Sequence, residues 1–278
     1  MTEGALWARA AAPPALGASE VHAWCVDLDA AGADGGAEAA GLSADERARA
    51  ARFHFARDRA RFLRCRAALR YLLAGYAGRE PHALVFAQGA HGKPALPGTG
   101  LEFNLSHSGG CAVLAVTRGR RVGVDVERIE AERATLAVAR RFFAPTEAAA
   151  VAAAAPAERA LTFFRCWTRK EAYVKARGEG LSLPLDRFEV PLEPNATDAL
   201  TVARDDHAEA RRWSLRELVP APHHLAALVV EGQGWTLRAW TWEPPTSPLT
   251  PPPRRAIADG PTPPGPARRA PEEKVRPG

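Results

Sequence analysis

The sequence contains little cysteine, and its cysteines are far apart. The 278 residues include four cysteines, at Cys25, Cys65, Cys111 and Cys166. A structural zinc site needs clustered ligands, and a disulfide framework is usually denser than this. We therefore expect buried free thiols in a reducing compartment.

The sequence also lacks a long hydrophobic run and a targeting segment. No apolar stretch approaches the ~20 residues that a membrane-spanning helix needs. The first residues include Glu3, carry no basic segment and are interrupted by Pro13 and Pro14, which is unlike a signal peptide. These absences predict a cytoplasmic protein without membrane contact.

What the chain does contain is an ordinary apolar fraction and an excess of basic residues. Hydrophobic residues make up 46% of the sequence, enough to form a substantial core. The formal net charge is +5 and suits an acidic partner, such as a nucleotide, a phosphate, a nucleic acid or an acidic protein. Charge alone does not choose among these partners.

An amphipathic helix is predicted around residues 163–176. Phe163, Trp167 and Val174 recur at helical spacing and form one apolar face. Glu171 and Lys175 lie one turn apart at its margin. Taken alone, they indicate a surface ion pair that contributes a few tenths of a kcal/mol.

A second acidic pattern makes a functional interpretation possible. Residues 122–127 read Val-Gly-Val-Asp-Val-Glu, so the valines share one face of a strand while Asp125 and Glu127 share the other. The two carboxylates would lie ~7 Å apart along the strand and could reach one cation. The alternative is simple alternation on an exposed strand.

The first half of the chain offers candidate phosphate ligands. Ser43 and Glu46 form a capping-box pattern that opens a helix at Ala44. A second helix is predicted from about residue 57 to 76, and one of its faces carries Arg57, Arg61 and Arg64. This basic face is either solvated or a phosphate clamp.

Two short segments then favour close contact with a ligand. In Gly92-Lys93-Pro94 the glycine lets the backbone approach a ligand, and the proline fixes the chain after it. Ser106 and His107, before a glycine turn, can donate hydrogen bonds to an anion.

The order of helices and short strands predicts an α+β fold, with each half packing helices on a small, mostly antiparallel sheet. We expect a loose N-terminus (1–19), a first subdomain (20–121), a second subdomain (122–243) and a disordered tail (244–278). About half of the 24 prolines lie in this tail. It is either a dispensable extension or an interaction arm.

The motifs occur in a characteristic order. They are Gly92-Lys93-Pro94, residues 103–109 (Phe-Asn-Leu-Ser-His-Ser-Gly), residues 122–127, Arg141-Phe142-Phe143 with Glu147, residues 167–175 (Trp-Thr-Arg-Lys-Glu-Ala-Tyr-Val-Lys) and residues 178–181 (Gly-Glu-Gly-Leu). This order resembles the Sfp type of 4′-phosphopantetheinyl transferase over about residues 42–190. The resemblance implies two similar subdomains related by a pseudo-twofold axis, with the active site between them.

The resemblance also implies an activity and its partners. Such enzymes move phosphopantetheine from coenzyme A to a serine of an acyl or peptidyl carrier protein, and they release adenosine 3′,5′-bisphosphate. They use Mg²⁺, with Mn²⁺ as a possible substitute. Many serve polyketide or nonribosomal peptide biosynthesis as monomers, without nucleic-acid or membrane partners.

Individual residues take roles from the resemblance. Asp125, Glu127 and Glu171 match the acidic metal site; Glu171 would also accept the serine proton, and Lys175 would stabilise the leaving phosphate. The predicted phosphate and nucleotide contacts are Arg49, Arg61, Gly92, Lys93, Pro94, Ser106, His107 and Lys175, with Arg57 as an additional candidate.

Two positions depart from the family pattern. Relatives of the Sfp type often carry a basic residue where this chain has Glu46, and a small polar residue where it has Phe62. Two other functions are therefore considered. A non-catalytic module that binds coenzyme A would have no reason to retain Asp125, Glu127, Glu171 and Lys175 together. A nucleic-acid binder would be expected to interleave its arginines with aromatic residues.

Overall fold

The computed structural model describes residues 7–30, 40–89, 91–203 and 207–244. Its strands are β1 (Trp7–Ala10), β2 (Glu20–Asp27), β3 (Ala87–Gln88), β4 (Pro94–Ala95), β5 (Leu101–Ser108), β6 (Cys111–Arg118), β7 (Val122–Arg128), β8 (Phe188–Glu189), β9 (Val202–Ala203), β10 (Trp213–Leu218), β11 (His224–Glu231) and β12 (Thr236–Trp242). Its α-helices are α2 (Ala44–Ala51), α3 (Ala56–Ala77), α4 (Leu136–Phe142), α5 (Pro145–Ala153), α6 (Arg159–Arg177) and α7 (His207–Arg212). Short 3-10 helices span Pro81–Ala83, Gly180–Ser182 and Leu185–Arg187.

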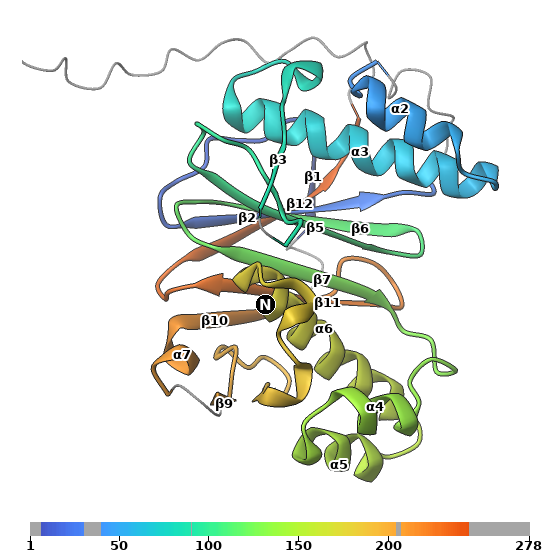
Figure 1. Ribbon diagram of the computed structural model, residues 1–278, viewed down its shortest axis with the longest axis vertical. Coiled ribbons are helices and arrows are strands. Elements are labelled where there is room, and N and C mark those ends of the chain that lie inside the picture. Colours follow the sequence, from blue (N-terminus) through green and yellow to red (C-terminus); the bar gives the residue numbers. More distant parts are fainter. Residues whose placement is uncertain (1–6, 31–39, 90, 204–206, 245–278) are drawn as a thin grey trace, which may run out of the picture.

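Two sheets are stacked between two long helices (Figure 1). A five-stranded sheet has the order β1-β12-β2-β6-β5, and a three-stranded sheet has the order β10-β11-β7. Helix α3 covers the outer face of the first sheet, while α6 covers the outer face of the second (Figure 1). The fold is therefore α+β with two similar subdomains, as the sequence predicted.

Buried apolar side chains form one core layer between each pair of neighbouring layers. The layer between the sheets includes Val124 of β7, Val113 of β6 and Leu228 of β11. Tyr173 of α6 packs in the layer beneath the second sheet, and Leu72 of α3 packs in the layer above the first. The valine face of β7 is thus interior, so the alternative of an exposed strand is wrong.

The helix boundaries follow local capping signals. The Ser43 hydroxyl accepts from the backbone N–H of Glu46, and the Glu46 carboxylate accepts from that of Ser43, which confirms the capping box. Helices α3 and α6 end at Gly78 and Gly178, each with a positive φ that glycine adopts without strain.

The sequence-based division of the chain differs from the sheets at two places. Strand β12, which lies within the predicted second subdomain (122–243), pairs in parallel with both β1 and β2 of the first sheet. Residues 7–10, within the segment expected to be loose (1–19), form β1. Both errors have one cause: these strands find partners at the opposite end of the chain, where a local pattern carries no information. The predicted tail lies almost entirely outside the described residues.

The expectation of buried free thiols is confirmed for Cys25, Cys65, Cys111 and Cys166. Among the described residues, no helix combines the length and apolarity needed to cross a bilayer.

Candidate active site

The site is built where α6 crosses β7. The valines of β7 face the inter-sheet core, so Gly123, Asp125 and Glu127 face the helix. A Cβ atom on Gly123 would lie 2.1 Å from the carbonyl oxygen of Ala172 and 2.3 Å from the backbone nitrogen of Ala176. Glycine at this position and alanines one helical turn apart therefore allow the two backbones to come into contact.

This contact brings the predicted catalytic residues together. Glu171 and Lys175 flank Ala172 on α6, and Asp125 lies two residues beyond Gly123 on β7. The Nζ atom of Lys175 lies 2.5 Å from Oδ1 of Asp125. Lys175 therefore bonds across to the strand, and the interpretation of Glu171 and Lys175 as an isolated surface ion pair is wrong.

The three carboxylates are held in an unfavourable environment for negative charge. Burial raises the pKa of Asp125, and the neighbouring Lys175 ammonium only partly offsets this. Burial also raises the pKa of Glu127 and of Glu171, with repulsion from Asp125 acting in the same direction on both. A cluster of this kind gains stability from any cation that binds to it.

The residues present are of the type that binds a hard divalent cation, although their carboxylates do not all lie at coordination distance from one point. Among the described residues, no three His, Cys, Asp or Glu side chains form a group at metal-binding spacing. However, the Oδ2 atom of Asp125 is buried and has no hydrogen-bond partner, and such an atom needs a compensating contact. Carboxylate oxygens are the donors that Mg²⁺ prefers.

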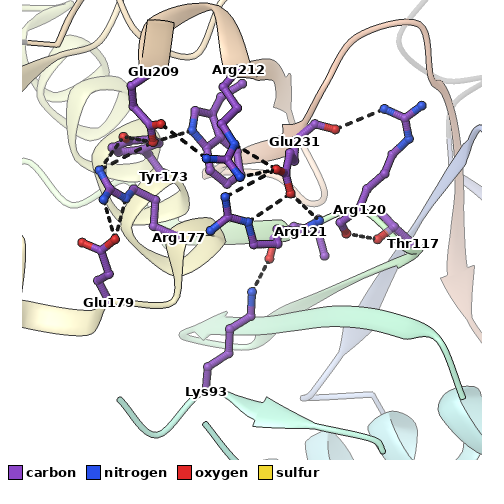
Figure 2. Close-up of polar contacts among 12 residues, drawn as sticks. Lys93, Thr117, Arg120, Arg121, Tyr173, Arg177, Glu179, Glu209, Arg212 and Glu231 are labelled. Atoms are coloured by element: carbon purple, nitrogen blue, oxygen red, sulfur yellow. Dashed lines mark hydrogen bonds and ion pairs between the residues drawn. The ribbon is translucent and has the colours of Figure 1, made fainter. Parts of the chain in front are cut away.

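A small cavity of about 250 Å³ opens beside this cluster. Its lining includes Glu171 and Lys175 of α6 together with Gly92 and Lys93 of the loop between β3 and β4. The Lys93 ammonium donates to the carbonyl oxygen of Val122 at 2.8 Å, and burial lowers the pKa of Lys93 to about 8. Figure 2 shows Lys93 reaching toward the strand next to Arg121. Lys93 thus ties the loop to the first residue of β7.

A larger cavity of about 640 Å³ lies beneath α2 and α3. Four residues expected to contact the nucleotide line it: Arg49, Arg61, Pro94 and His107. The predicted ligand-binding residues are therefore divided between two cavities, and Asn104 lines both. Ser106 and the additional candidate Arg57 lie outside both linings, and Ser106 lies close to Lys175.

The arginine face of α3 serves more than one purpose. Arg61 makes a bidentate ion pair with Asp29, at 2.7 and 2.6 Å, on the rim of the large cavity. Arg64 is buried and donates to the carbonyl oxygen of Asp27. Arg57 is exposed beside Asp58 and does not line the cavity. Only Arg61 of the three is therefore placed as a phosphate contact would be.

Sequence reasoning did not select several residues that the structure places at the site. Phe53 and Phe62 line the large cavity with ring centroids 5.2 Å apart, and the Arg49 guanidinium lies over the Phe62 ring. They lie nine residues apart, with the start of α3 between them, so a helical or strand periodicity could not have predicted that they meet. Glu46, the acidic residue at a position that is often basic in relatives, is not part of the cavity lining. It pairs instead with Arg66, which lines the cavity, and with Arg70, which does not.

A buried ion pair supports the helix that carries the catalytic candidates. Lys170 of α6 lies 2.7 Å from the carboxylate of Glu147 and also donates to the carbonyl oxygens of Leu185 and Phe188. The Glu147 carboxylate in turn accepts from the backbone N–H of Val190. The Lys170 ammonium and both Glu147 carboxylate oxygens are hydrogen-bonded within the protein. Glu147 and Lys170 therefore anchor α6 and do not face the cavities.

The C-terminal end of α6 is fixed by a second polar network (Figure 2). Arg177 pairs with Glu179 and donates to the Tyr173 hydroxyl, which donates to Glu209 at 2.9 Å. Glu209 lies 3.9 Å from Arg212, which continues the network to Glu231 and Arg121. These contacts hold the helix turn after Lys175 against α7 and the second sheet.

The sequence matches known families over most of its length. Residues 121–229 match the family model described as the 4′-phosphopantetheinyl transferase superfamily. Residues 36–119 match the model described as 4′-phosphopantetheinyl transferase, N-terminal. The two matches lie end to end and together include the site elements α3, β5, β7 and α6.

Full-length relatives agree with these matches. The chain is 40% identical to the 4′-phosphopantetheinyl transferase HetI of Nostoc sp. over 225 residues, which are 80% of this chain and 92% of the relative. It is 30% identical to the 4′-phosphopantetheinyl transferase Sfp of Bacillus subtilis, over 60% of this chain and 73% of the relative. It is 28% identical to the L-aminoadipate-semialdehyde dehydrogenase-phosphopantetheinyl transferase of Homo sapiens, over 68% and 67% of the two chains. This chain therefore belongs to the 4′-phosphopantetheinyl transferases.

Proposed function

We propose that this transferase moves 4′-phosphopantetheine from coenzyme A to a serine hydroxyl of an acyl or peptidyl carrier protein, with Mg²⁺ bound at the site. The products would be the holo carrier protein and adenosine 3′,5′-bisphosphate. One observation carries the proposal: Lys175 of α6 bonds to Asp125 of β7, and Glu127 and Glu171 lie close enough to this pair for the charges to affect one another, beside a small cavity that Glu171 and Lys175 line.

Asp125, Glu127 and Glu171 would hold the metal ion. When bound, Mg²⁺ neutralises charge on a pyrophosphate and polarises its phosphorus–oxygen bonds. The raised pKa values of these three carboxylates and the unpartnered Oδ2 of Asp125 support this assignment. Mn²⁺, with similar ligand preferences, would substitute.

Glu171 is the proposed general base. It is half-buried, it lines the small cavity, and its pKa is raised above that of an exposed glutamate. A raised pKa makes a carboxylate a better proton acceptor at neutral pH. It would take the proton from the carrier serine as that oxygen attacks the β-phosphorus of coenzyme A.

Lys175 is the proposed electrostatic partner of the leaving group. Its ammonium has three N–H groups, of which two are used on Asp125 and Ser106. The third remains available to a phosphate oxygen of adenosine 3′,5′-bisphosphate. Negative charge grows on that oxygen when the phosphoanhydride bond breaks, so the contact strengthens in the transition state.

The large cavity is the proposed nucleotide site. Arg49, Arg61 and His107 line it and offer donors to phosphates, while Pro94 and the two phenylalanines offer apolar surface to the base. A cavity of about 640 Å³ lies within the usual range for small-molecule sites. Gly92 and Lys93 would contact the ligand from the adjoining small cavity.

The carrier protein and coenzyme A would be the partners, and the enzyme would act as a cytoplasmic monomer without nucleic-acid or membrane partners. The competing candidate, a non-catalytic module that binds coenzyme A, is disfavoured because the chain retains Glu171 and Lys175 close to Asp125, where the proposed chemistry would use them.

Mass spectrometry of an apo carrier protein tests the reaction. The carrier is incubated with this protein, coenzyme A and Mg²⁺. We expect a mass gain of about 340 Da, one phosphopantetheine group on serine, which a chelator abolishes. A carrier whose target serine is replaced by alanine should gain nothing. No gain on several acyl and peptidyl carriers, with coenzyme A still bound, would favour the non-catalytic module instead.

A further inference from the structure

Strand β5 carries polar side chains at every second position on the face toward β7. These are Asn104, Ser106 and Ser108, and all three are largely buried. Residues two apart on a strand share a face. The two strands are edges of different sheets, so no backbone ladder joins them. Polar side chains form the connection between these edges.

The first and last of these side chains satisfy backbone groups of β7. The amide oxygen of Asn104 accepts from the N–H of Val124 at 2.8 Å. The hydroxyl oxygen of Ser108 accepts from the N–H of Arg128 at 3.1 Å. Edge-strand N–H groups that are buried need such partners. These contacts fix the register of β5 against β7.

The two serines then donate to the two carboxylates of β7. The Ser106 hydroxyl donates to Oδ1 of Asp125 at 2.9 Å, and the Ser108 hydroxyl donates to Oε2 of Glu127 at 2.7 Å. The donors are two residues apart, and so are the acceptors, so each pair meets side by side. Hydroxyl and carboxylate are matched one to one.

The proton count at Ser106 limits what else this residue can do. A hydroxyl has one proton to donate, and that of Ser106 is directed to Asp125. Its oxygen already accepts from the Lys175 ammonium at 3.0 Å. Both hydrogen-bonding functions of Ser106 are therefore used within the carboxylate cluster in this arrangement. Oδ1 of Asp125 is likewise saturated, which leaves Oδ2 open.

His107 lies between the two serines and has a different environment. Because strand side chains alternate, it points away from β7, and it lines the large cavity. Strand β5 thus contacts the carboxylates of β7 through Ser106 and Ser108 on one face, and it lines the large cavity with His107 on the other.

We propose that Ser106 and Ser108 are positioning residues of the metal site. They orient Asp125 and Glu127 by hydrogen bonds, so that the free carboxylate oxygens face Glu171. This inference rests on the proposed function, because it assigns the carboxylates to a metal ion. Loss of either hydroxyl should weaken metal binding and leave nucleotide binding intact.

The test measures the two ligands separately. Mn²⁺ affinity is followed by the electron paramagnetic resonance signal of the free ion, and affinity for adenosine 3′,5′-bisphosphate is followed by calorimetry without metal. Ser106→Ala and Ser108→Ala should each weaken Mn²⁺ binding about 10-fold, the usual effect of removing an outer-shell partner, with nucleotide affinity unchanged. Ser106→Thr and Ser108→Thr keep the hydroxyl and should restore Mn²⁺ binding. His107→Ala should show the reverse pattern.

Ser214→Ala is the matched control. Ser214 is a buried strand serine that also makes two or more hydrogen bonds, but its partners are Val230, Gly232 and Trp235. It should leave Mn²⁺ affinity unchanged, which separates positioning from a general loss of buried hydrogen bonds. If Ser106→Ala does not fold, Ser108→Ala, at the edge of the cluster, decides the question.

Each outcome has a distinct meaning. If Ser106→Ala loses nucleotide affinity and keeps Mn²⁺ affinity, Ser106 is a phosphate ligand and the inference is wrong. If both alanine variants bind Mn²⁺ as the unmodified protein does, the positioning role is wrong while the proposed function stands. If the unmodified protein binds neither ligand and transfers nothing, the proposed function and this inference both fail.

Discussion

The Glu171 carboxylate is half-buried beside two other carboxylates, and this environment suits a proton acceptor. Water cannot fully stabilise its charge, and Asp125 and Glu127 repel it, so its pKa is raised. Lys175, one turn later, limits that rise. At the scale of single residues, the site balances three negative charges against one positive charge.

Replacing Glu171 by glutamine should separate chemistry from binding. Glutamine has nearly the same size but cannot accept the serine proton. We expect Glu171→Gln to lower transfer by ~100-fold or more while coenzyme A still binds. Initial rates with an apo carrier and calorimetry with coenzyme A measure the two effects. Full transfer by this variant would remove Glu171 from the proposed mechanism.

Asp125→Asn should stabilise the metal-free protein at neutral pH. The pKa of Asp125 is raised on folding, so the folded carboxyl holds its proton more firmly than the unfolded one. As the pH rises from the unfolded pKa through the folded pKa, ionisation of this residue therefore lowers the free energy of unfolding. Asparagine removes this cost. Lys175, whose side chain is 28% exposed, can be hydrated after losing its partner.

Thermal unfolding at two pH values checks this sign. The melting temperature of Asp125→Asn should exceed that of the unmodified protein at pH 7, and the difference should shrink toward pH 3, where the aspartate is protonated in both states. Mg²⁺ should raise the melting temperature of the unmodified protein only, and coenzyme A binding by the variant should lose its metal dependence. If the variant is less stable than the unmodified protein at pH 7, burial is not the dominant influence on the pKa of Asp125.

At the scale of elements, the contact between α6 and β7 sets the geometry of the site. Gly123 lets the helix backbone touch the strand backbone, with Ala172 and Ala176 as the helix residues in contact. Neither partner is a flexible side chain that could move aside. The glycine of the Val-Gly-Val-Asp-Val-Glu segment therefore matters as much as its acids.

Gly123→Ala should displace α6 and reduce both stability and transfer. The added methyl group would overlap backbone atoms, and overpacking of this kind costs roughly 1–3 kcal/mol. Denaturant unfolding measures the loss. Gly89→Ala is the control, since a Cβ there would meet its nearest atom at 3.4 Å, and it should change stability little. Equal stabilities for the two variants would show that the helix can shift without cost.

At the scale of the whole molecule, the two subdomains are not separable. Strand β12 follows β11 of the second sheet in the chain, yet it lies between β1 and β2 of the first sheet. The layer of side chains between the sheets draws on both. The first half therefore lacks β12 of its own sheet, and neither half contains the whole layer of side chains between the sheets.

Thermal unfolding should therefore be a single cooperative transition. The calorimetric and van't Hoff enthalpies should agree, and near-ultraviolet signals from the tryptophans should change together with the far-ultraviolet signal. Trp24 and Trp240 stack in the first sheet, while Trp213 is buried in the second, so the aromatic signal samples both. Two resolved transitions would mean that the halves fold independently.

The sequence predicted the elements whose signals are local. The capping box at Ser43 and the alternation in β7 are set by near neighbours, and the structure confirms them. The meeting of Glu171 and Lys175 with Asp125 was expected from the family resemblance, and no periodicity could show it. The positions of β1 and β12 depend on distant pairing, and the bond from Ser106 to Asp125 depends on how two sheet edges approach. Neither the distant pairing nor the approach of the two edges produces a pattern within a short stretch of sequence.

The pairing of Glu20 in β2 with Thr236 in β12 has a consequence during synthesis. A strand made early on the ribosome must wait for a partner made near the end of the described chain, and until then one long edge of the first sheet stays open. Contacts so far apart in sequence make folding slow. Exposed strand edges invite association with other nascent chains. Recovery of native protein should therefore depend on chaperone supply and on translation rate more than its equilibrium stability suggests.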